Sequence, residues 1–510
     1  MFRDYSILIF FAILKESFMK FRWVILIFLF AVVLRLWNLN QMGRTWDEMV
    51  QLVKGHQFIE LIKKGDFANS FWYQNPDHPP LKDYTYGLAG YLDQGQYDLT
   101  YSRLVSVLFS SLSVALVVLI GWEFISPFVG IAGGVILAML PFFLGLSQLV
   151  TIESPLMFFF TAAIYSFFKF LRKFSLQKAI VTGVLLGLAL ETKFTNVLLI
   201  PLLIVLYALW YIFFEKKKKK KILYKYFLLI FFVAFVVFFL LWPMPWFHLS
   251  DILGFNYHMR FENTKYSIPE VFFGKVRLVP IFYYSLYFFI TTPLLILLLF
   301  FVGIRSIFKK KTFILCALLL WFSFPFMQSF YNFRQHGVRY IIEIYAPLAL
   351  LAAVGFESLI DRFTKKLKIK LLCFFPIVIY LFVIIFRITP YYLDYFNIFV
   401  GGARGVYERN LFQLGWWGQG IKEASLYLDK HAKQHATVGL AVIPLDVVPP
   451  TPHLKTELYK KGKRYDYVIV SHFNVTREGF DDSEIKKNYK PIYFVNADGA
   501  HLVTVYKRNK

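Results

Sequence analysis

Long apolar runs recur along the chain from residue 23 to residue 389, separated by short polar stretches. The hydrocarbon core of a bilayer needs about 20 consecutive apolar residues for each helix that crosses it. Runs of about this length predict roughly eleven spanning helices, at 23–39, 103–123, 127–146, 154–171, 177–192, 195–214, 224–245, 279–304, 312–330, 340–358 and 370–389. We therefore expect a mainly α, polytopic membrane protein.

The pattern changes after residue 389, where the chain becomes less apolar. Short strand-like runs follow at 437–443, 467–470, 491–495 and 502–506. A helical stretch over 419–431 precedes them, a combination that is typical of a small α/β domain. We expect a transmembrane catalytic domain over 1–389 with a large outer loop at 40–102. We expect the α/β domain over 390–510 to lie outside the membrane.

Composition and charge sharpen this picture. Of the 510 residues, 58% are hydrophobic and 17% are charged, which excludes an ordinary soluble domain.

The net charge of +24 could indicate a nucleic-acid partner, but its distribution indicates topology instead. Five loop segments hold 24 basic and 4 acidic residues, namely 1–22, 169–178, 215–225, 305–311 and 361–370. All five fall on one side of the predicted spans. The positive-inside rule makes that side cytoplasmic, with the N-terminus. We therefore predict a plasma-membrane protein that contacts lipids, with no nucleic-acid partner.

Four ionisable residues stand at the opposite, outer boundary. Asp47 and Glu48 follow the first span, Arg103 opens the second, and Glu153 opens the fourth. Taken alone, the two acids could simply complement a helix dipole. Ionisable groups that gather at one membrane depth nevertheless indicate a functional site. We therefore place the chemistry at this boundary.

The motifs around these residues resemble a known group of membrane enzymes. They are the acidic pair at 47–48, His-Pro-Pro-Leu at 78–81, Arg-Leu-Val at 103–105, Glu-Ser-Pro-Leu-Met-Phe-Phe at 153–159, Gly-Leu-Ala-Leu-Glu-Thr-Lys-Phe-Thr at 187–195, His-Gly-Val-Arg-Tyr at 336–340, Pro-Tyr-Tyr-Leu-Asp-Tyr-Phe-Asn at 390–397 and Trp-Trp-Gly-Gln-Gly at 416–420. In this order, over about 40–430, they resemble the protein O-mannosyltransferase-like superfamily, which includes the aminoarabinose lipid A transferases. The resemblance implies the GT-C fold and a polyprenyl-phosphate sugar as donor. It also implies transfer to an acceptor hydroxyl with inversion.

Such a transfer needs a base for the hydroxyl proton and cations for the phosphate leaving group. By position and by resemblance, Asp47 is the candidate base. Glu48 and Glu153 are candidates for positioning the acceptor or a metal, although the fourth-span acid is often aspartate in the superfamily. Arg103 is the candidate phosphate ligand, because a guanidinium can bind phosphate through two hydrogen bonds.

Four more residues are candidates for substrate binding, each with a structural alternative. His78 can instead bond the backbone of its turn, Lys82 can be a solvated loop residue, and Lys193 and Arg339 can anchor helix ends at the interface. The sequence points to no definite cofactor. A divalent cation shared by Asp47 and Glu153 is a further candidate.

The acceptor stays open at this stage among lipid, glycan and protein. A transporter or lipid flippase is the competing class, and it would place charges near the bilayer midplane. A non-catalytic scaffold of the same fold is the third alternative. The mid-span positions are almost entirely apolar, which favours the glycosyltransferase.

Overall fold

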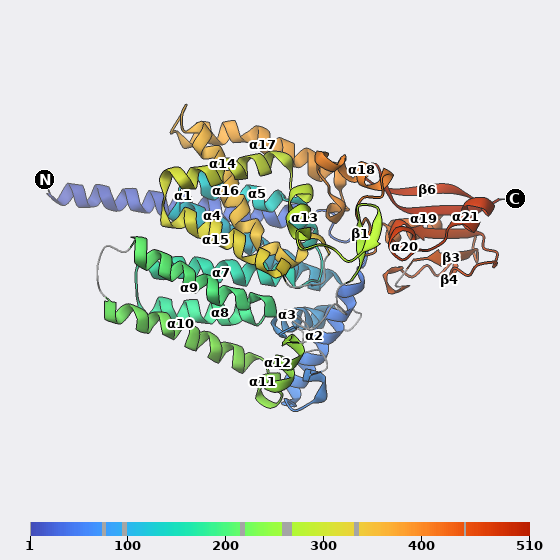
Figure 1. Cartoon of the computed structure of the whole chain (residues 1–510), viewed down its shortest axis with the longest axis horizontal. Coiled ribbons are helices and arrows are strands. Elements are labelled where there is room, and N and C mark those ends of the chain that lie inside the picture. Colours follow the sequence, from blue (N-terminus) through green and yellow to red (C-terminus); the bar gives the residue numbers. More distant parts are fainter. Residues whose placement is uncertain are drawn as a thin grey trace.

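The computed structural model describes residues 2–73, 78–93, 99–214, 220–257, 268–330, 336–442 and 445–509. A bundle of long helices follows the longest axis of the molecule, and a small sheet domain stands at one end (Figure 1). The bundle helices are α1 (Phe2–Leu36), α4 (Leu99–Phe124), α5 (Pro127–Met139), α7 (Glu153–Arg172), α8 (Leu176–Leu190), α9 (Leu199–Leu209), α10 (Lys220–Leu241), α14 (Leu294–Lys310), α15 (Phe313–Ser323), α16 (Tyr345–Ile360) and α17 (Leu367–Ile388). The expected mainly α membrane fold is confirmed.

The expected number of spans is not confirmed. Seven described helical segments are long and apolar enough to cross a membrane, and a bent pair makes up to eight. That pair is α13 (Tyr283–Thr291) with α14, and the chain bends by 116° between them. Pro293 stands at this bend, and a proline ring cannot continue the preceding helix. The shorter apolar helices α5, α8 and α15 occupy the positions of the three other predicted spans.

Burial separates central from peripheral helices. Glu153–Arg172 and Gly337–Ile360 are the most buried of the seven spans, whereas Ser17–Leu36 and Tyr224–Leu241 are among the least buried. Phe232 and Phe235 of α10, for example, are 65% and 62% exposed. Such large exposed apolar side chains are the surface that a bilayer would cover.

Several short elements gather at the end of the bundle that carries the sheet domain (Figure 1). They are α2 (Trp46–Lys64), α3 (Leu81–Gly90), α11 (Met244–Phe247), α12 (Leu249–Tyr257) and the hairpin of β1 (Glu270–Phe272) and β2 (Lys275–Arg277). The predicted outer loop at 40–102 is therefore largely helical. This end of the molecule holds all the elements that line the site described below.

The C-terminal part is a five-stranded mixed sheet with short helices. Its strands are β3 (Thr437–Ala441), β4 (Lys455–Leu458), β5 (Tyr467–Ser471), β6 (Tyr489–Ala497) and β7 (Ala500–Arg508), in the spatial order β4-β3-β5-β7-β6. β3 pairs in parallel with both β4 and β5, and β7 runs antiparallel to β5 and β6. The helices are α18 (Gly402–Glu408), α19 (Ile421–His431), α20 (His472–Thr476) and α21 (Ser483–Asn488). The expected small α/β domain is confirmed, and β4 was not predicted.

Candidate active site

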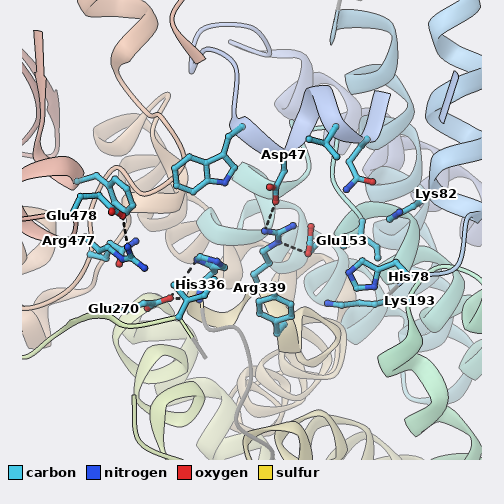
Figure 2. A pocket seen from close by; sticks show the side chains of 18 residues that line it. Asp47, His78, Lys82, Glu153, Lys193, Glu270, His336, Arg339, Arg477 and Glu478 are labelled. Atoms are coloured by element: carbon cyan, nitrogen blue, oxygen red, sulfur yellow. Dashed lines mark hydrogen bonds and ion pairs between the residues drawn. The ribbon is translucent and has the colours of Figure 1, made fainter. Parts of the chain in front are cut away.

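A cavity of about 520 Å³ lies where the bundle meets the C-terminal domain. Its walls come from α2, the start of α3, the starts of α7 and of the 3₁₀ helix η8 (Gly337–Ile344), the β1 segment and α20. The lining residues are Trp46, Asp47, Val50, Gln51, His78, Lys82, Ile152, Glu153, Lys193, Ile268, Glu270, His336, Arg339, Tyr340, Gln413, Phe473, Arg477 and Glu478. Figure 2 shows their side chains converging on the cavity from both parts of the chain.

Arg339 joins two of the predicted acids at the centre of the cavity (Figure 2). Its Nε donates to Oε1 of Glu153 at 2.7 Å, and Nη1 donates to Oδ2 of Asp47 at 3.1 Å. Glu153 is buried, while the Asp47 side chain keeps 36% of its surface exposed. Asp47 is therefore the carboxylate of this group that a substrate can reach most easily.

The position of Asp47 follows from how α2 begins and packs. Glu48 caps the helix, since its Oε2 accepts the N–H of Thr45 at 2.9 Å. Gly55 of α2 lies against Gly87 of α3, and a Cβ on Gly55 would come within 2.7 Å of the Gly87 nitrogen. Only glycines permit this approach of the two backbones. The close packing brings Asp47 and the first turn of α3 to one cavity.

Glu48 and Arg103 lie outside the cavity lining and bind each other. The two oxygens of Glu48 accept Nε and Nη2 of Arg103 at 2.8 and 2.7 Å. Glu48 also accepts the N–H of Val150 at 2.9 Å. The other three N–H groups of the guanidinium are taken by oxygens of Leu39, Asn40 and Gly43. Because all five donors of Arg103 are used, the pair fixes the α1–α2 linker and offers no donor to a phosphate.

Basic side chains gather at the end of the cavity formed by α3 and the connection between α8 and the 3₁₀ helix η3 (Phe194–Leu198). His78, Lys82 and Lys193 line it (Figure 2). Lys82 Nζ lies 2.7 Å from Oδ2 of Asp83. Lys193 is 1% exposed, and its Nζ lies 4.5 Å from the centre of the Tyr340 ring. Burial lowers the pKa of Lys193.

Several buried polar atoms of the cavity make no hydrogen bond within the described part of the chain. Among them are Nζ of Lys193 and Oε2 of Glu153, together with the amide oxygens of Gln51 and Gln413. Buried polar groups are normally satisfied, and an orphan one costs about 1–3 kcal/mol. A lysine nitrogen and a carboxylate oxygen that both face a cavity are therefore ready to bind a ligand that carries an anionic group and a donor group.

The opposite end of the cavity holds a carboxylate and an imidazole that were not assigned from the sequence. Oε1 of Glu270 accepts the backbone N–H of His336 at 2.6 Å and lies 3.6 Å from Nδ1 of the same residue. Oε2 accepts the hydroxyl of Tyr283, which itself accepts the N–H of Gly337 at 2.8 Å. His336 has a φ of 47° and Gly337 a φ of 63°. Glu270 and Tyr283 thus hold the left-handed turn that leads into Arg339.

A pH-dependent stability follows from Glu270. Burial raises its pKa to about 7 from a usual 4.5. A carboxyl whose folded-state pKa is raised loses stabilisation as pH rises from about 4.5 through 7, which amounts to about 3 kcal/mol here. We expect Glu270→Gln to flatten the fall in melting temperature of the purified protein between pH 5 and pH 8. Asp394, whose pKa burial also raises to about 7, will keep part of the slope.

The measurement compares melting temperatures across that pH range in one detergent. Glu408→Gln serves as the control, because Glu408 is exposed on α18. An unchanged slope in Glu270→Gln would show that the carboxyl does not titrate in this range.

The C-terminal domain contributes directly to the cavity. Phe473, Arg477 and Glu478 line it from α20 and the residues that follow α20 (Figure 2). Arg477 Nε donates to the carbonyl of Pro269 at 3.0 Å, and Nη1 lies 2.5 Å from Glu478. These contacts tie the domain to the β1 segment that carries Glu270.

A pair of tryptophans lies beneath the ionic centre. The ring of Trp417 is 4.2 Å from the guanidinium carbon of Arg339. Trp416 stacks on Trp417 with centroids 4.6 Å apart, and His336 stacks on Trp416 at 5.0 Å. The glycine-rich turn after residue 410 therefore supports Arg339 and His336 from the C-terminal side.

An apolar groove of about 270 Å³ lies beside the cationic end. Side chains of α8, η3 (Phe194–Leu198), α9 and α10 line it, namely Leu186, Leu190, Phe194, Val197, Ile200, Phe231, Ala234, Phe235 and Phe238. Phe194 of the groove follows directly on Lys193 of the cavity. Two consecutive residues of the sequence thus line the apolar groove and the cationic end of the cavity.

Comparison with known proteins agrees with this architecture. Residues 77–242 match the dolichyl-phosphate-mannose-protein mannosyltransferase family. ArnT from Cupriavidus metallidurans bound to undecaprenyl phosphate is 13% identical, with 95% of this chain and 98% of that chain covered and a TM-score of 0.51. The oligosaccharyltransferase AglB from Archaeoglobus fulgidus, in complex with an inhibitory peptide and a dolichol-phosphate, is 12% identical, with 97% and 75% covered and a TM-score of 0.51. The chain has the GT-C fold of membrane glycosyltransferases. No curated protein matches it by sequence.

Within this GT-C fold, the structure brings together six of the eight residues proposed from the sequence. Asp47, Glu153, His78, Lys82, Lys193 and Arg339 line one cavity, and Glu48 and Arg103 do not. Glu270, Arg477 and Glu478 were missed. They follow no recognisable spacing, and they lie far along the chain from the outer loop. The only available signal for His336 was its place in the His-Gly-Val-Arg-Tyr motif.

A shared metal ion does not fit the two central acids as they are arranged. The Arg339 guanidinium already lies between Asp47 and Glu153 and binds both. Within the described part of the chain, no group of three or more His, Cys, Asp or Glu side chains could hold a metal ion. The positive charge at the centre of this site is supplied by an arginine.

Proposed function

We propose that the chain transfers a sugar from a polyprenyl-phosphate donor to an acceptor hydroxyl, with inversion at the sugar. The observation that carries the proposal is that consecutive residues, Lys193 and Phe194, line the cationic end of the cavity and the apolar groove. A polyprenyl phosphate has a long apolar chain joined to an anion. It is the kind of substrate that matches both features at once.

The donor would lie with its prenyl chain in the groove and its phosphate near Lys193 and Arg339. The buried nitrogen of Lys193 has no hydrogen-bond acceptor among the described residues, and Arg339 can turn its remaining N–H groups to the phosphate. Lys82 adds a third cation at the same end. The undecaprenyl phosphate and dolichol-phosphate in the ArnT and AglB structures support a lipid phosphate as ligand of this fold.

Asp47 would act as the base. The acceptor oxygen forms a bond to the anomeric carbon, the bond from that carbon to the phosphate oxygen breaks, and the hydroxyl proton moves to Asp47. Lys193 and Arg339 stabilise the charge that develops on the leaving phosphate. The polyprenyl phosphate then departs along the groove. The step is a single displacement and needs no covalent intermediate between the sugar and a carboxylate.

The remaining predicted residues take supporting roles in this proposal. Glu153 holds Arg339 and presents its free Oε2 to the sugar. His78 lines the donor end. Glu48 and Arg103, predicted as a positioning acid and a phosphate ligand, instead hold each other and the start of α2, since Arg103 has no donor left for a phosphate.

The acceptor would enter from the end formed by the C-terminal domain, where Phe473, Arg477 and Glu478 line the cavity. Lipid, glycan and protein acceptors all remain candidates. We propose that this end faces out of the cell. Helices α7 and α16 run from the cavity end towards the basic segments 169–178 and 361–370, which the positive-inside rule makes cytoplasmic. The protein would then be a multi-pass plasma-membrane enzyme with its C-terminal domain outside.

A transfer assay tests the function. The purified chain in lipid vesicles is given polyprenyl-phosphate donors that carry radiolabelled hexose or pentose, together with lipid, glycan and peptide acceptors. We expect labelled product from one acceptor class and release of polyprenyl phosphate. Movement of the intact donor across the vesicle without bond cleavage would instead identify a flippase. Complete inactivity with every donor would favour a scaffold.

A further inference from the structure

Arg103 lines a second cavity, of about 230 Å³, that shares no residue with the active-site cavity. It lies between the α1–α2 linker, the start of α4, the start of α19 and the segment after the 3₁₀ helix η11 (Leu445–Val447). Its lining residues are Asn40, Gly43, Arg44, Leu99, Arg103, Lys422, Asp446, Val447, Val448, Pro449 and Pro450. We call this space the linker cavity.

Two cations of the linker cavity have donors to spare. Arg44 is half-buried and makes no hydrogen bond or ion pair with any described residue. Lys422 is also half-buried, and its Nζ donates to the carbonyl of Asn40 at 2.8 Å. Arg103, by contrast, is neutralised by Glu48. Burial, followed by the charge of Arg103, lowers the pKa of Lys422, so an anion beside it would be stabilising.

Among the described residues, Asp446 is the one acid that lines this space, and it does not neutralise these two cations. Asp446 is exposed, and in the described part of the chain no ion pair joins it to Arg44 or Lys422. An arginine and a lysine that converge on a small concave space make a site for a phosphate group. The walls of valine, proline and leucine restrict water around such an anion.

The place of the linker cavity identifies the kind of molecule that carries the phosphate. The candidate span Leu99–Phe124 begins at this cavity with Leu99, and the span Ser17–Leu36 ends four residues before its lining residue Asn40. Large apolar side chains remain exposed on the adjoining turns, among them Trp37 at 41% and Tyr101 at 38%. Exposed tryptophan and tyrosine at the ends of spans mark the level of lipid headgroups.

We propose that the linker cavity binds the phosphate of an anionic membrane lipid, in the leaflet on the side of the C-terminal domain. Arg44 and Lys422 bind the headgroup, and the acyl chains lie on the exposed apolar faces of α1 and α4. Because Arg44 belongs to the linker and Lys422 to α19, the lipid joins the transmembrane part to the C-terminal domain.

The α1–α2 linker packs closely against the C-terminal domain at this cavity. A Cβ on Gly43 would lie 2.9 Å from Cβ of Lys422, and one on Gly418 would lie 3.3 Å from the carbonyl oxygen of Arg44. The linker is therefore in close contact with the C-terminal domain both at Gly43 and at the carbonyl group of Arg44. The backbone positions from which the two cations extend are thus fixed before a ligand arrives, which favours binding.

Lipid binding by the purified full chain tests the proposal. Native mass spectrometry in detergent measures retention of phosphatidylglycerol, with phosphatidylcholine and inorganic phosphate as separate arms. We expect saturable retention of phosphatidylglycerol and binding at least about tenfold weaker for the other two. Arg44→Gln and Lys422→Gln should each weaken phosphatidylglycerol retention about tenfold or more, the scale of one charge-assisted contact.

Lys490→Gln is the matched control, since Lys490 is exposed on β6 of the same domain. Arg44→Lys should retain most of the binding, and it separates loss of charge from a folding defect. Equal retention in wild type and both glutamine variants would overturn the proposal. Inorganic phosphate bound as tightly as the lipid would overturn the lipid assignment. Binding of phosphatidylcholine as tight as that of phosphatidylglycerol would overturn the requirement for a lipid with a net negative headgroup, because phosphatidylcholine balances its phosphate with a choline cation.

Discussion

Asp47→Asn is expected to reduce sugar transfer by about 10²–10⁴-fold, the usual contribution of a general base. Asparagine keeps the shape of the side chain and can still face Arg339, but it cannot accept the hydroxyl proton. The loss should therefore appear in kcat, with donor binding nearly unchanged. The rate of label transfer in membranes, normalised to protein abundance, is the measurement.

Two further variants make this test decisive. Asp251→Asn removes an exposed carboxylate of α12 that does not line the cavity, and its activity should equal that of wild type. Glu153→Gln alters the other central acid. If Asp47→Asn stays active while Glu153→Gln loses sugar transfer, the base is Glu153, and the assignment of Asp47 is refuted.

Arg339→Ala is expected to have the second large effect, on donor use and on stability together. Removing the guanidinium leaves the carboxylate of Glu153 buried without its partner, and breaking a buried ion pair of this kind costs about 3–5 kcal/mol. The phosphate also loses a ligand. Because the alanine variant will be less stable, Arg339→Lys is the sharper probe, since it keeps the charge and loses the forked geometry.

We expect Arg339→Lys to raise KM for the polyprenyl-phosphate donor by about tenfold, as one lost charge-assisted hydrogen bond would. Inhibition by free polyprenyl phosphate should weaken in parallel. Arg103→Ala is the comparison, because Arg103 belongs to a buried ion pair outside the cavity. It should lower abundance and melting temperature and leave the KM of the remaining folded enzyme unchanged. A selective rise in donor KM for Arg103→Ala would return Arg103 to the site.

The sequence predicted which ionisable residues lie at one depth but could not say which of them pair. The position of Asp47, Arg103 and Glu153 at span ends follows from the apolar periodicity alone. The pairing of Arg103 with Glu48 rather than with a substrate depends on the path of the α1–α2 linker, whose oxygens take three of its donors. No local pattern encodes such a path.

Long-range contacts explain the other differences. Arg339 reaches Asp47 across 292 positions of the chain, and Glu270 binds the backbone of His336 across 66. Glu270 stands in a three-residue strand, which is too short to leave a periodic signal. The apolar runs predicted the positions of the helices better than their lengths. A proline such as Pro293 divides one uninterrupted apolar run into two helices that differ in direction.

The stacked pair of Trp416 and Trp417 has a consequence for how this protein can be divided or recombined. Trp417 supports Arg339, so a truncation after residue 389 would remove the floor of the reaction centre along with the tail. An exchange of C-terminal domains between related enzymes should therefore be made beyond residue 420. The stacked tryptophans and their glycine-rich turn then stay with the membrane part. Such an exchange would keep the support of Arg339 and would replace Phe473, Arg477 and Glu478 at the other end of the cavity, so it would change the acceptor side alone.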